Sequence, residues 1–234
     1  MCPTFTLDNA SNPSTSDIPQ CVPSDPISRS AYAVAASHLP PAILNHSLRV
    51  WIYARTLFTS QSQSQSETIE PPHRLALLFT ACIMHDIGAI PAFAHIGSVD
   101  ELQRFEIEGA DAAVAQLKSS GDPSISPVDI DEVWRAIALH TTPQIAERMG
   151  GMVRIVRLAV LTDFGRGDVE ESVRKEVESQ FGRLEIEKVL GDAIVKQALD
   201  SPMPEKKAPA ASWPNNLLEA RRAHSERDGV NKRS

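Results

Sequence analysis

The sequence predicts an all-α fold, a helical bundle with a buried metal site. Apolar residues recur at spacings of three and four in several segments, and no segment keeps the alternation of apolar and polar residues that is typical of a strand. Runs rich in proline, glycine and serine separate these segments. Histidine and aspartate interrupt the apolar faces at three places, and a buried charge is costly unless it is paired or bound to a metal.

The first helix is predicted from its capping residues. Residues 1–24 are rich in serine, proline, asparagine and aspartate without periodicity, which predicts a flexible N-terminal arm. Asp25 and Pro26 then supply an N-cap followed by proline at the first helical position. A short helix therefore begins there and ends before Pro40.

Periodicity, capping residues and breaks predict the remaining helices. A polar loop is expected over residues 60–66 and an irregular segment over 91–99. Capping boxes are expected at Ser126 with Asp129 and at Asp168 with Glu171. The helices are expected to end near Phe58, at the His85-Asp86 pair, and near Lys118, His140, Asp163, Gly182, Leu199 and Ala223.

These elements divide the chain into three parts. The flexible arm covers residues 1–24, an all-α domain covers 25–200, and a Pro/Ala-rich tail covers 201–234. Within the tail, Trp213 begins a short helix that we expect to dock on the domain through its apolar side chains.

Charge and composition argue against several classes of partner. The net charge is −7 and the pI is near 5.5, which argues against nucleic acid or an anionic membrane as a partner. No stretch approaches the roughly 18 apolar residues needed to span a bilayer, and the N-terminus lacks the pattern of a secretory signal. The three cysteines form neither a disulfide pattern nor a CxxC motif, so we expect a reducing, cytoplasmic location. The sequence does not fix the oligomeric state, and a homo-oligomer is one possible partner arrangement.

The pair His85-Asp86 carries the most information about function. It ends the apolar run 75–84 and precedes Ile87 and Gly88. One interpretation is a helix C-terminus, with Gly88 as a left-handed cap and His85 favourably placed in the last turn. That interpretation leaves Asp86 at the unfavourable end of the helix dipole, whereas a metal ion accounts for both side chains.

Two further residues lie on apolar helical faces. His46 shares its face with Val50, and Asp163 shares its face with Val160. A lone histidine on such a face is more often a core residue than a ligand, but two histidines and two aspartates on three faces favour a metal. The mixture of nitrogen and oxygen donors suits zinc, iron or manganese rather than calcium.

The order of these residues, H…HD…D, with the HD pair at the end of an apolar helix, resembles the HD-domain superfamily of metal-dependent hydrolases. The resemblance covers roughly residues 40–165 and implies an HD-domain helical bundle. It also implies one divalent metal ion, zinc first, with iron or manganese as alternatives. The implied ligands are His46, His85, Asp86 and Asp163.

Four segments are similar to the cyanamide hydratase branch of that superfamily. They are His46–Arg49, Ala81–Gly88, Arg104–Gly109 and Ala136–Thr141. That branch adds water to a nitrile carbon and converts cyanamide to urea. The resemblance implies a metal-dependent hydro-lyase for cyanamide or a similar small neutral nitrile, and a bound metal would lower the pKa of water toward neutral pH.

Three side chains are candidates for catalysis, namely Asp86, Glu106 and His140. Asp86 would act as a ligand, and Glu106 or His140 would move the proton. Glu106 lies near the apolar edge of its helix, where the alternative is a solvated first-turn acid. His140 continues an apolar stripe, and its alternatives are a core histidine or a ligand to a second metal. We favour a substrate contact for His140, because the extra paired histidines of two-metal relatives are missing.

Four residues are candidates for binding substrate or supporting the ligands, namely Asn45, Arg49, Phe93 and His95. Arg49 lies one turn after His46, where it can pair with Asp86 or Asp163, and the alternative is a surface salt bridge. Phe93 and His95 follow the HD pair in the irregular segment and are expected at the mouth of the pocket. By contrast, side chains expected on solvated faces are those of Glu108, Arg154 and Arg157.

Phosphohydrolysis of nucleotides is the chief alternative function. Such substrates need cationic clamps on phosphate. Between Leu75 and His140, ten acidic residues stand against three basic ones, which favours a small neutral molecule. Two further alternatives are a hydratase that acts on an isonitrile carbon and a protein whose metal only holds the helices together.

Overall fold

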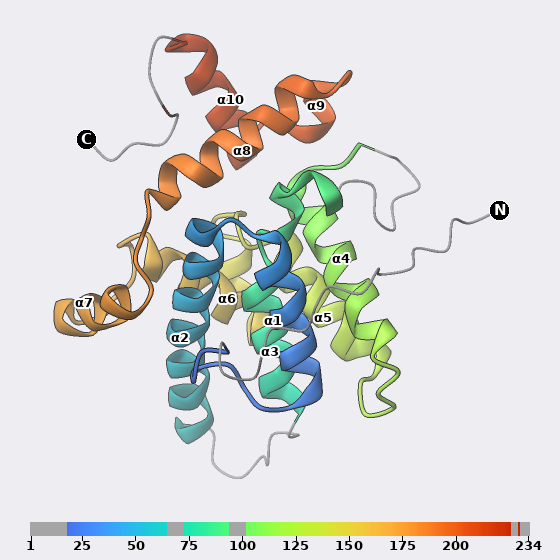
Figure 1. Cartoon of the computed structure of the whole chain (residues 1–234), viewed down its shortest axis with the longest axis vertical. Coiled ribbons are helices and arrows are strands. Elements are labelled where there is room, and N and C mark those ends of the chain that lie inside the picture. Colours follow the sequence, from blue (N-terminus) through green and yellow to red (C-terminus); the bar gives the residue numbers. More distant parts are fainter. Residues whose placement is uncertain (1–17, 65–72, 94–101, 226–228, 230–234) are drawn as a thin grey trace.

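The computed structural model describes residues 18–64, 73–93, 102–225 and 229, and in these ranges the chain is all-α without a strand (Figure 1). The fold class predicted from the sequence is confirmed. Residues 1–17 of the predicted arm lie outside the described ranges. The helices of the described part are α1 (Pro26–His38), α2 (Pro41–Ser64), α3 (His73–Met84), η1 (Ile87–Ala89), η2 (Pro91–Phe93), α4 (Phe105–Ser119), α5 (Pro127–Ala138), η3 (Ala146–Arg148), α6 (Gly151–Asp163), α7 (Glu171–Gln180), α8 (Ile186–Asp200), α9 (Pro204–Lys207) and α10 (Trp213–Ala223), where η marks a 3-10 helix.

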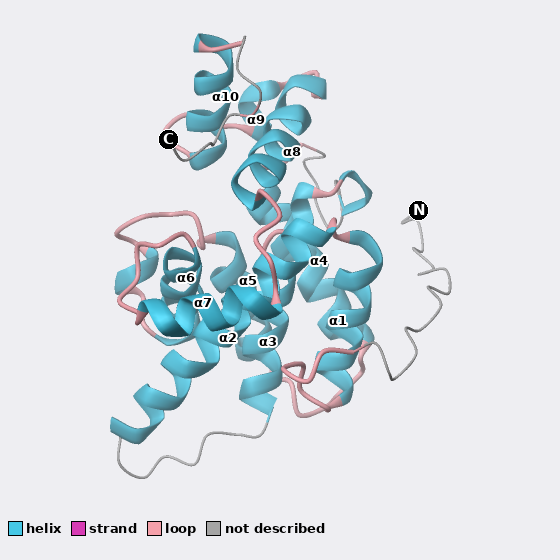
Figure 2. Ribbon diagram, turned by 60° about the vertical axis from the view of Figure 1, so that its left-hand side comes forward, coloured by secondary structure: helices cyan, strands magenta, loops and turns pink. Residues whose placement is uncertain are grey.

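Helix α3 forms the centre of the bundle. Every residue from Ala76 to Met84 is buried, as expected for a helix that is apolar on all sides. Helices α1, α2 and α5 pack against it, α6 packs on α2 and α5, and α4 lies against α5 (Figures 1 and 2). The residues that follow α3 therefore enter the interior of the bundle.

Local capping chemistry sets several helix starts. The side chain of Asp25 accepts a hydrogen bond from the amide of Ser28, which confirms the predicted N-cap of α1. Ser126 and Asp129 form the predicted capping box of α5. The second predicted box is wrong, because α7 begins at Glu171 behind an N-cap at Glu170 that makes no side-chain capping bond.

Helix α2 is longer than the sequence predicts. It continues to Ser64, so the polar loop expected over residues 60–66 is wrong for its first part. The hydroxyls of Thr56, Thr59 and Ser60 each donate to the carbonyl four residues earlier. These bonds satisfy the three hydroxyls within the helix, which runs past its predicted end near Phe58.

Helices α8, α9 and α10 lie together at one end of the molecule (Figure 2). The helix predicted from Trp213 to Ala223 is confirmed as α10, and it buries Leu217 and Leu218. Gln197 of α8 donates from Nε2 to the carbonyl of Gly88 at 2.8 Å, so this end of the molecule contacts the turn after the His85-Asp86 pair. No described helix is both long and apolar enough to cross a membrane.

Candidate metal centre

The His85-Asp86 pair lies in the turn directly after α3. Both side chains are buried, and the chain continues into η1. Gly88 belongs to η1 and its φ is not positive, so the interpretation of Gly88 as a left-handed cap is wrong. Its missing side chain serves another purpose, because a Cβ there would lie 2.0 Å from the carbonyl oxygen of Phe105. Gly88 thus lets this turn pack directly on the backbone of α4.

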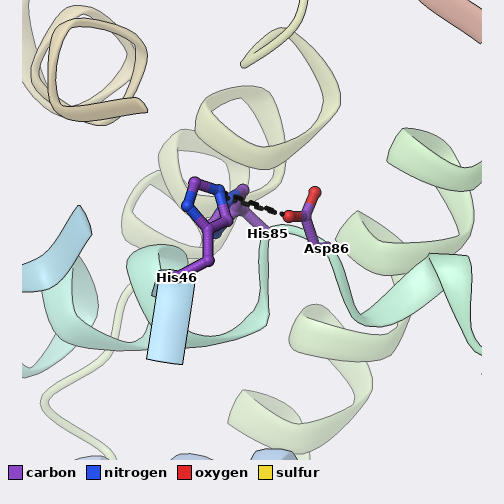
Figure 3. A group of neighbouring side chains, drawn as sticks. All are labelled: His46, His85 and Asp86. Atoms are coloured by element: carbon purple, nitrogen blue, oxygen red, sulfur yellow. Dashed lines mark hydrogen bonds and ion pairs between the residues drawn. The ribbon is translucent and has the colours of Figure 1, made fainter. Parts of the chain in front are cut away.

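His46, His85 and Asp86 bring three ligand atoms together (Figure 3). The Nε2 atoms of the two histidines are 3.2 Å apart, and Asp86 Oδ2 lies 3.5 Å from His46 Nε2 and 3.3 Å from His85 Nε2. Two atoms about 2.0–2.1 Å from one ion at the tetrahedral angle are about 3.4 Å apart. The triangle therefore has the dimensions of one face of a metal coordination shell.

Hydrogen bonds fix which nitrogen of each histidine is available. Nδ1 of His85 lies 2.7 Å from the carbonyl oxygen of Cys82, and Nδ1 of His46 lies 2.7 Å from Asp163 Oδ2. Because a carbonyl and a carboxylate accept, these nitrogens carry the protons and the Nε2 lone pairs face Asp86. Both oxygens of Asp86 are buried without a hydrogen bond in the described structure. Lone pairs directed at a carboxylate repel it, and a divalent cation between them removes that repulsion.

Burial and neighbouring charges shift the pKa values of all three converging residues. Burial lowers the pKa of His46 despite the opposing effect of Asp163, which keeps the imidazole neutral. Burial also opposes ionisation of Asp86, but His85, His140 and His46 outweigh it and hold the pKa of this carboxyl well below its usual range. Burial opposes protonation of His85, but Asp86 outweighs it and raises the pKa of this imidazole. A neutral His46 and an ionised Asp86 are the forms that bind a metal, and a bound metal would displace any proton that His85 holds at Nε2. The residues present therefore fit a divalent metal ion.

Asp163 lies behind His46, outside the group of converging ligand atoms. Arg49 donates from Nε to Oδ1 at 2.7 Å and from Nη2 to Oδ2 at 2.9 Å, so the two side chains form a buried bidentate pair. Burial opposes ionisation of Asp163, but His46 and Arg49 outweigh it and lower its pKa well below the ordinary value. This carboxylate orients the His46 ring, and its predicted role as a direct ligand stays a prediction.

A protein-family model described as HD domain matches residues 43–229. The chain belongs to the HD-domain family. HD domains bind divalent metals and are generally hydrolases, which agrees with the converging histidines and aspartate. The match runs past residue 200, the boundary that the sequence predicts between the domain and the tail. No curated protein matches the chain.

His140 of this HD domain faces the group formed by His46, His85 and Asp86. Its Nε2 lies 3.4 Å from Asp86 Oδ1, and its ring is edge-to-face with that of His85. Nδ1 lies 2.6 Å from the carbonyl oxygen of Ile137, so Nε2 presents its lone pair to the site. The carbonyl of His140 accepts a hydrogen bond from Arg157 at 2.9 Å. Arg157 is therefore largely buried beneath the site, and its expected place on a solvated face is wrong.

Glu106 is buried beside His140 rather than solvated. Its Oε1 accepts from Thr141 Oγ1 at 2.5 Å, and both of its oxygens accept from the guanidinium of Arg104. Thr141 follows His140 in the chain, so Glu106 supports the segment that carries this histidine. The alternative interpretation of a solvated first-turn acid is wrong.

The other predicted contact residues have different surroundings. Asn45 donates from Nδ2 to the carbonyl of Gly182 at 3.0 Å. Phe93 is buried, and its ring lies edge-to-face with that of His38 in α1. His95 lies outside the described residues. A substrate contact for any of these residues stays a prediction.

Sequence reasoning missed a buried ion pair at the start of α4. Glu108, expected at the surface, is fully buried and pairs with Lys207 of α9. The two residues are 99 positions apart, and neither carries a local sequence signal of the pairing. Sequence reasoning also gave no role to Arg183, which donates a hydrogen bond to the carbonyl of Asp163.

Proposed function

We propose that this HD-domain protein is a metal-dependent hydratase that adds water to the carbon of a small neutral nitrile, with cyanamide as the substrate and urea as the product. The family supports a metal-dependent enzyme of hydrolase type, and the reaction with cyanamide rests on the sequence resemblance described above. The three ligand atoms of His46, His85 and Asp86 support a divalent ion, with zinc as the first choice.

The chain supplies the metal-binding groups and a proton acceptor. When bound, the ion would lower the pKa of water and polarise the nitrile. His140 would take the proton released by the attacking water, because its Nε2 lone pair faces the site while Nδ1 is fixed on Ile137. Glu106 is less suited to this task, since Arg104 and Thr141 already engage its oxygens. We assign Glu106 to holding the segment of His140 in place.

The observation that best supports a neutral substrate is the pairing of the arginines around the site with carboxylates. In the part of the chain that the structure describes, the arginines that contact the site or its supporting residues are paired with carboxylates. These pairs are Arg49 with Asp163, Arg104 with Glu106, Arg157 with Glu147, and Arg183 with Glu178 and Glu187. A phosphate ester needs cationic groups that are available to its oxygens. The pairing therefore supports a small neutral molecule over a nucleotide.

The test is the formation of urea from cyanamide by the purified, zinc-loaded protein. We expect urea from the wild type and none from His85→Ala, because that variant loses a ligand. His140→Gln should bind zinc like the wild type and form urea at least 100-fold more slowly, as is typical for the loss of a general base. No urea from zinc-bound wild type would overturn the proposal, and isonitriles, other nitriles and phosphate esters would then be assayed in that order.

A further inference from the structure

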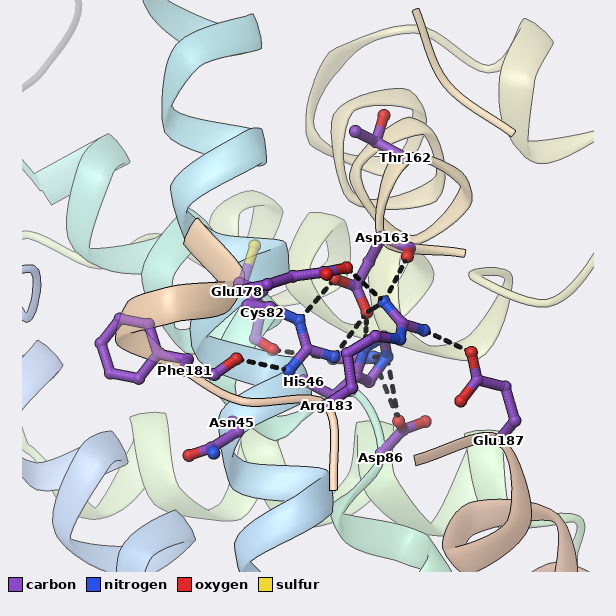
Figure 4. A network of polar contacts seen from close by, with 12 residues as sticks. Asn45, His46, Cys82, Asp86, Thr162, Asp163, Glu178, Phe181, Arg183 and Glu187 are labelled. Atoms are coloured by element: carbon purple, nitrogen blue, oxygen red, sulfur yellow. Dashed lines mark hydrogen bonds and ion pairs between the residues drawn. The ribbon is translucent and has the colours of Figure 1, made fainter. Parts of the chain in front are cut away.

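The linker between α7 and α8, residues 181–185, lies over the pair of Asp163 and His46 (Figure 4). Arg49 of α2 donates from Nη1 to the carbonyl oxygens of Phe181 at 3.0 Å and Gly182 at 3.1 Å. The linker thus accepts hydrogen bonds from the same guanidinium that grips Asp163. This arrangement ties the linker to the part of α2 that carries His46.

Arg183 of the linker reaches back to the end of α6. Its Nη1 donates to the backbone carbonyl of Asp163 at 2.9 Å, and its guanidinium lies 6.0 Å from the ring centre of Phe164. Glu178 and Glu187 hold the guanidinium from two sides (Figure 4). Arg183 therefore joins α7, α8 and the last residue of α6 at one point.

The residues at the end of α6 also contact the His46 ring. Asp163 Oδ2 accepts from His46 Nδ1, and the ring of Phe164 lies 5.0 Å from that of His46. A shift of this helix end would move both contacts together. The backbone next to Arg183 is held in an unfavourable conformation, because Leu184 and Glu185 have φ of 50° and 56° without being glycine. Such backbone persists where surrounding contacts determine it.

We propose that Arg183 is a positioning residue for the metal centre. It fixes the end of α6, so that Asp163 and Phe164 hold the ring of His46 with Nε2 directed at His85 and Asp86. The inference rests on the metal-binding part of the proposed function and not on the reaction.

Arg174 provides a matched control. Its Nη1 donates at 2.7 Å to the carbonyl of Thr162, the residue before Asp163. Both arginines thus bind carbonyls at the same helix end, where cations are favourable. Arg183 alone of the two also approaches the carboxylate of Asp163, with Nη1 3.8 Å from Oδ2, and stacks near Phe164. A general loss of helix-end stability would affect the two variants alike.

The loss of the charge of Arg183 and the loss of its positioning effect change zinc affinity in opposite directions, so the test distinguishes them. Removal of a cation close to the site would by itself strengthen the binding of a divalent cation. Loss of the position of His46 would weaken it, and loss of such outer contacts typically weakens metal binding by about 10–100-fold. A lower affinity therefore reports on position.

The experiment measures zinc affinity by competition with a chromophoric chelator for the full-length wild type, Arg183→Met, Arg183→Lys and Arg174→Met. Unfolding of each metal-free protein is measured alongside. We expect Arg183→Met to bind zinc about 10–100-fold more weakly than the wild type. Arg183→Lys should fall between them, because lysine keeps the charge but cannot reach all the acceptors. Arg174→Met should stay within about twofold of the wild type, although it unfolds more easily.

Four outcomes would overturn the inference. Equal or tighter binding of zinc by Arg183→Met would show that charge decides rather than position. A similar loss in Arg174→Met would show that general helix-end stability decides. If Arg183→Met fails to fold, wild-type affinity in Arg183→Lys would overturn the inference. A wild type that binds no zinc would overturn the metal centre itself as well, so the two failures are distinguishable.

Discussion

Gly88 and Phe105 are packed backbone to backbone, so that a Cβ added to Gly88 would lie 2.0 Å from the carbonyl oxygen of Phe105. We predict that Gly88→Ala lowers the free energy of unfolding by about 3 kcal/mol or more, because this backbone contact has no side chain that can move aside. Denaturation in urea measures the loss. Gly121→Ala is the control, since its site is open and only its positive φ opposes the change, at about 1 kcal/mol. Equal losses in the two variants would contradict the prediction.

The bidentate pair of Arg49 and Asp163 gives a second prediction. Arg49→Met leaves the buried carboxylate without its main counter-charge, so we expect a loss of about 3–5 kcal/mol in the free energy of unfolding. The double variant Arg49→Met with Asp163→Leu removes the stranded charge and should be more stable than Arg49→Met alone. Chemical unfolding of both variants decides. A double variant less stable than the single one would show that the pair does not act as a unit.

Metal binding should stabilise the fold by linkage. Free zinc at about 100 times its Kd should raise the free energy of unfolding by about 2.7 kcal/mol, because the unfolded chain holds no preformed site. A chelator should reverse the gain, and His85→Ala should lack it. Thermal unfolding with and without zinc measures the effect. The exposed His38 supplies the control, since His38→Ala should keep the full gain.

Glu132 gives a prediction about pH. Burial disfavours its charge, but hydrogen bonds from Arg74 and from the amide of Met152 outweigh burial and lower its pKa. A lowered pKa contributes stability above the unfolded value of about 4.3 and loses it as the pH falls through that value and below. The stability difference between wild type and Glu132→Gln should therefore be largest near neutral pH and shrink below about pH 4. Chemical unfolding of both proteins from neutral pH to below about pH 4 measures this difference. A difference in the free energy of unfolding that did not change with pH would refute the prediction.

The buried pair of Lys207 and Glu108 should anchor α9 to α4. Lys207→Met leaves the buried carboxylate of Glu108 without this cation, so we expect a loss of about 3–5 kcal/mol in the free energy of unfolding. Lys196 pairs with Asp200 at the surface, and Lys196→Met should change stability by less than about 1 kcal/mol. Comparable effects in the two variants would mean that burial of the Lys207 pair adds nothing.

Local signals in the sequence predicted much of the fold. The N-cap Asp25 and the box of Ser126 and Asp129 act within one helical turn, so the sequence alone contains them. The apolar faces around His46 and Asp163 likewise follow from a period of 3.6 residues. Helix α2 was underestimated because serine and threonine favour loops by composition, while here their hydroxyls bond to the helix backbone.

The contacts that complete the site could not be predicted from the sequence. A helical face indicates that Asp163 is buried, but not whether it meets a metal or the Nδ1 of His46. Glu108 in a first turn has the pattern of a solvated acid favoured by the helix dipole, and its burial depends on a lysine 99 residues away. Long-range pairing of charges leaves no periodic trace, so Lys207 and Arg183 could only be found in three dimensions.

His46 and Asp163 are separated by 117 residues, and Arg49 bonds to a carbonyl 132 residues further on. A ribosome adds about 5–20 residues per second, so His46 spends roughly ten seconds in the nascent chain before its carboxylate partner is made. The contacts that orient His46 and Arg49 can form only after residues 163–182 have been synthesised. A metal ion would therefore meet the complete, oriented set only after the α7–α8 linker has been made, and translation that stops before this linker would yield a protein without these contacts.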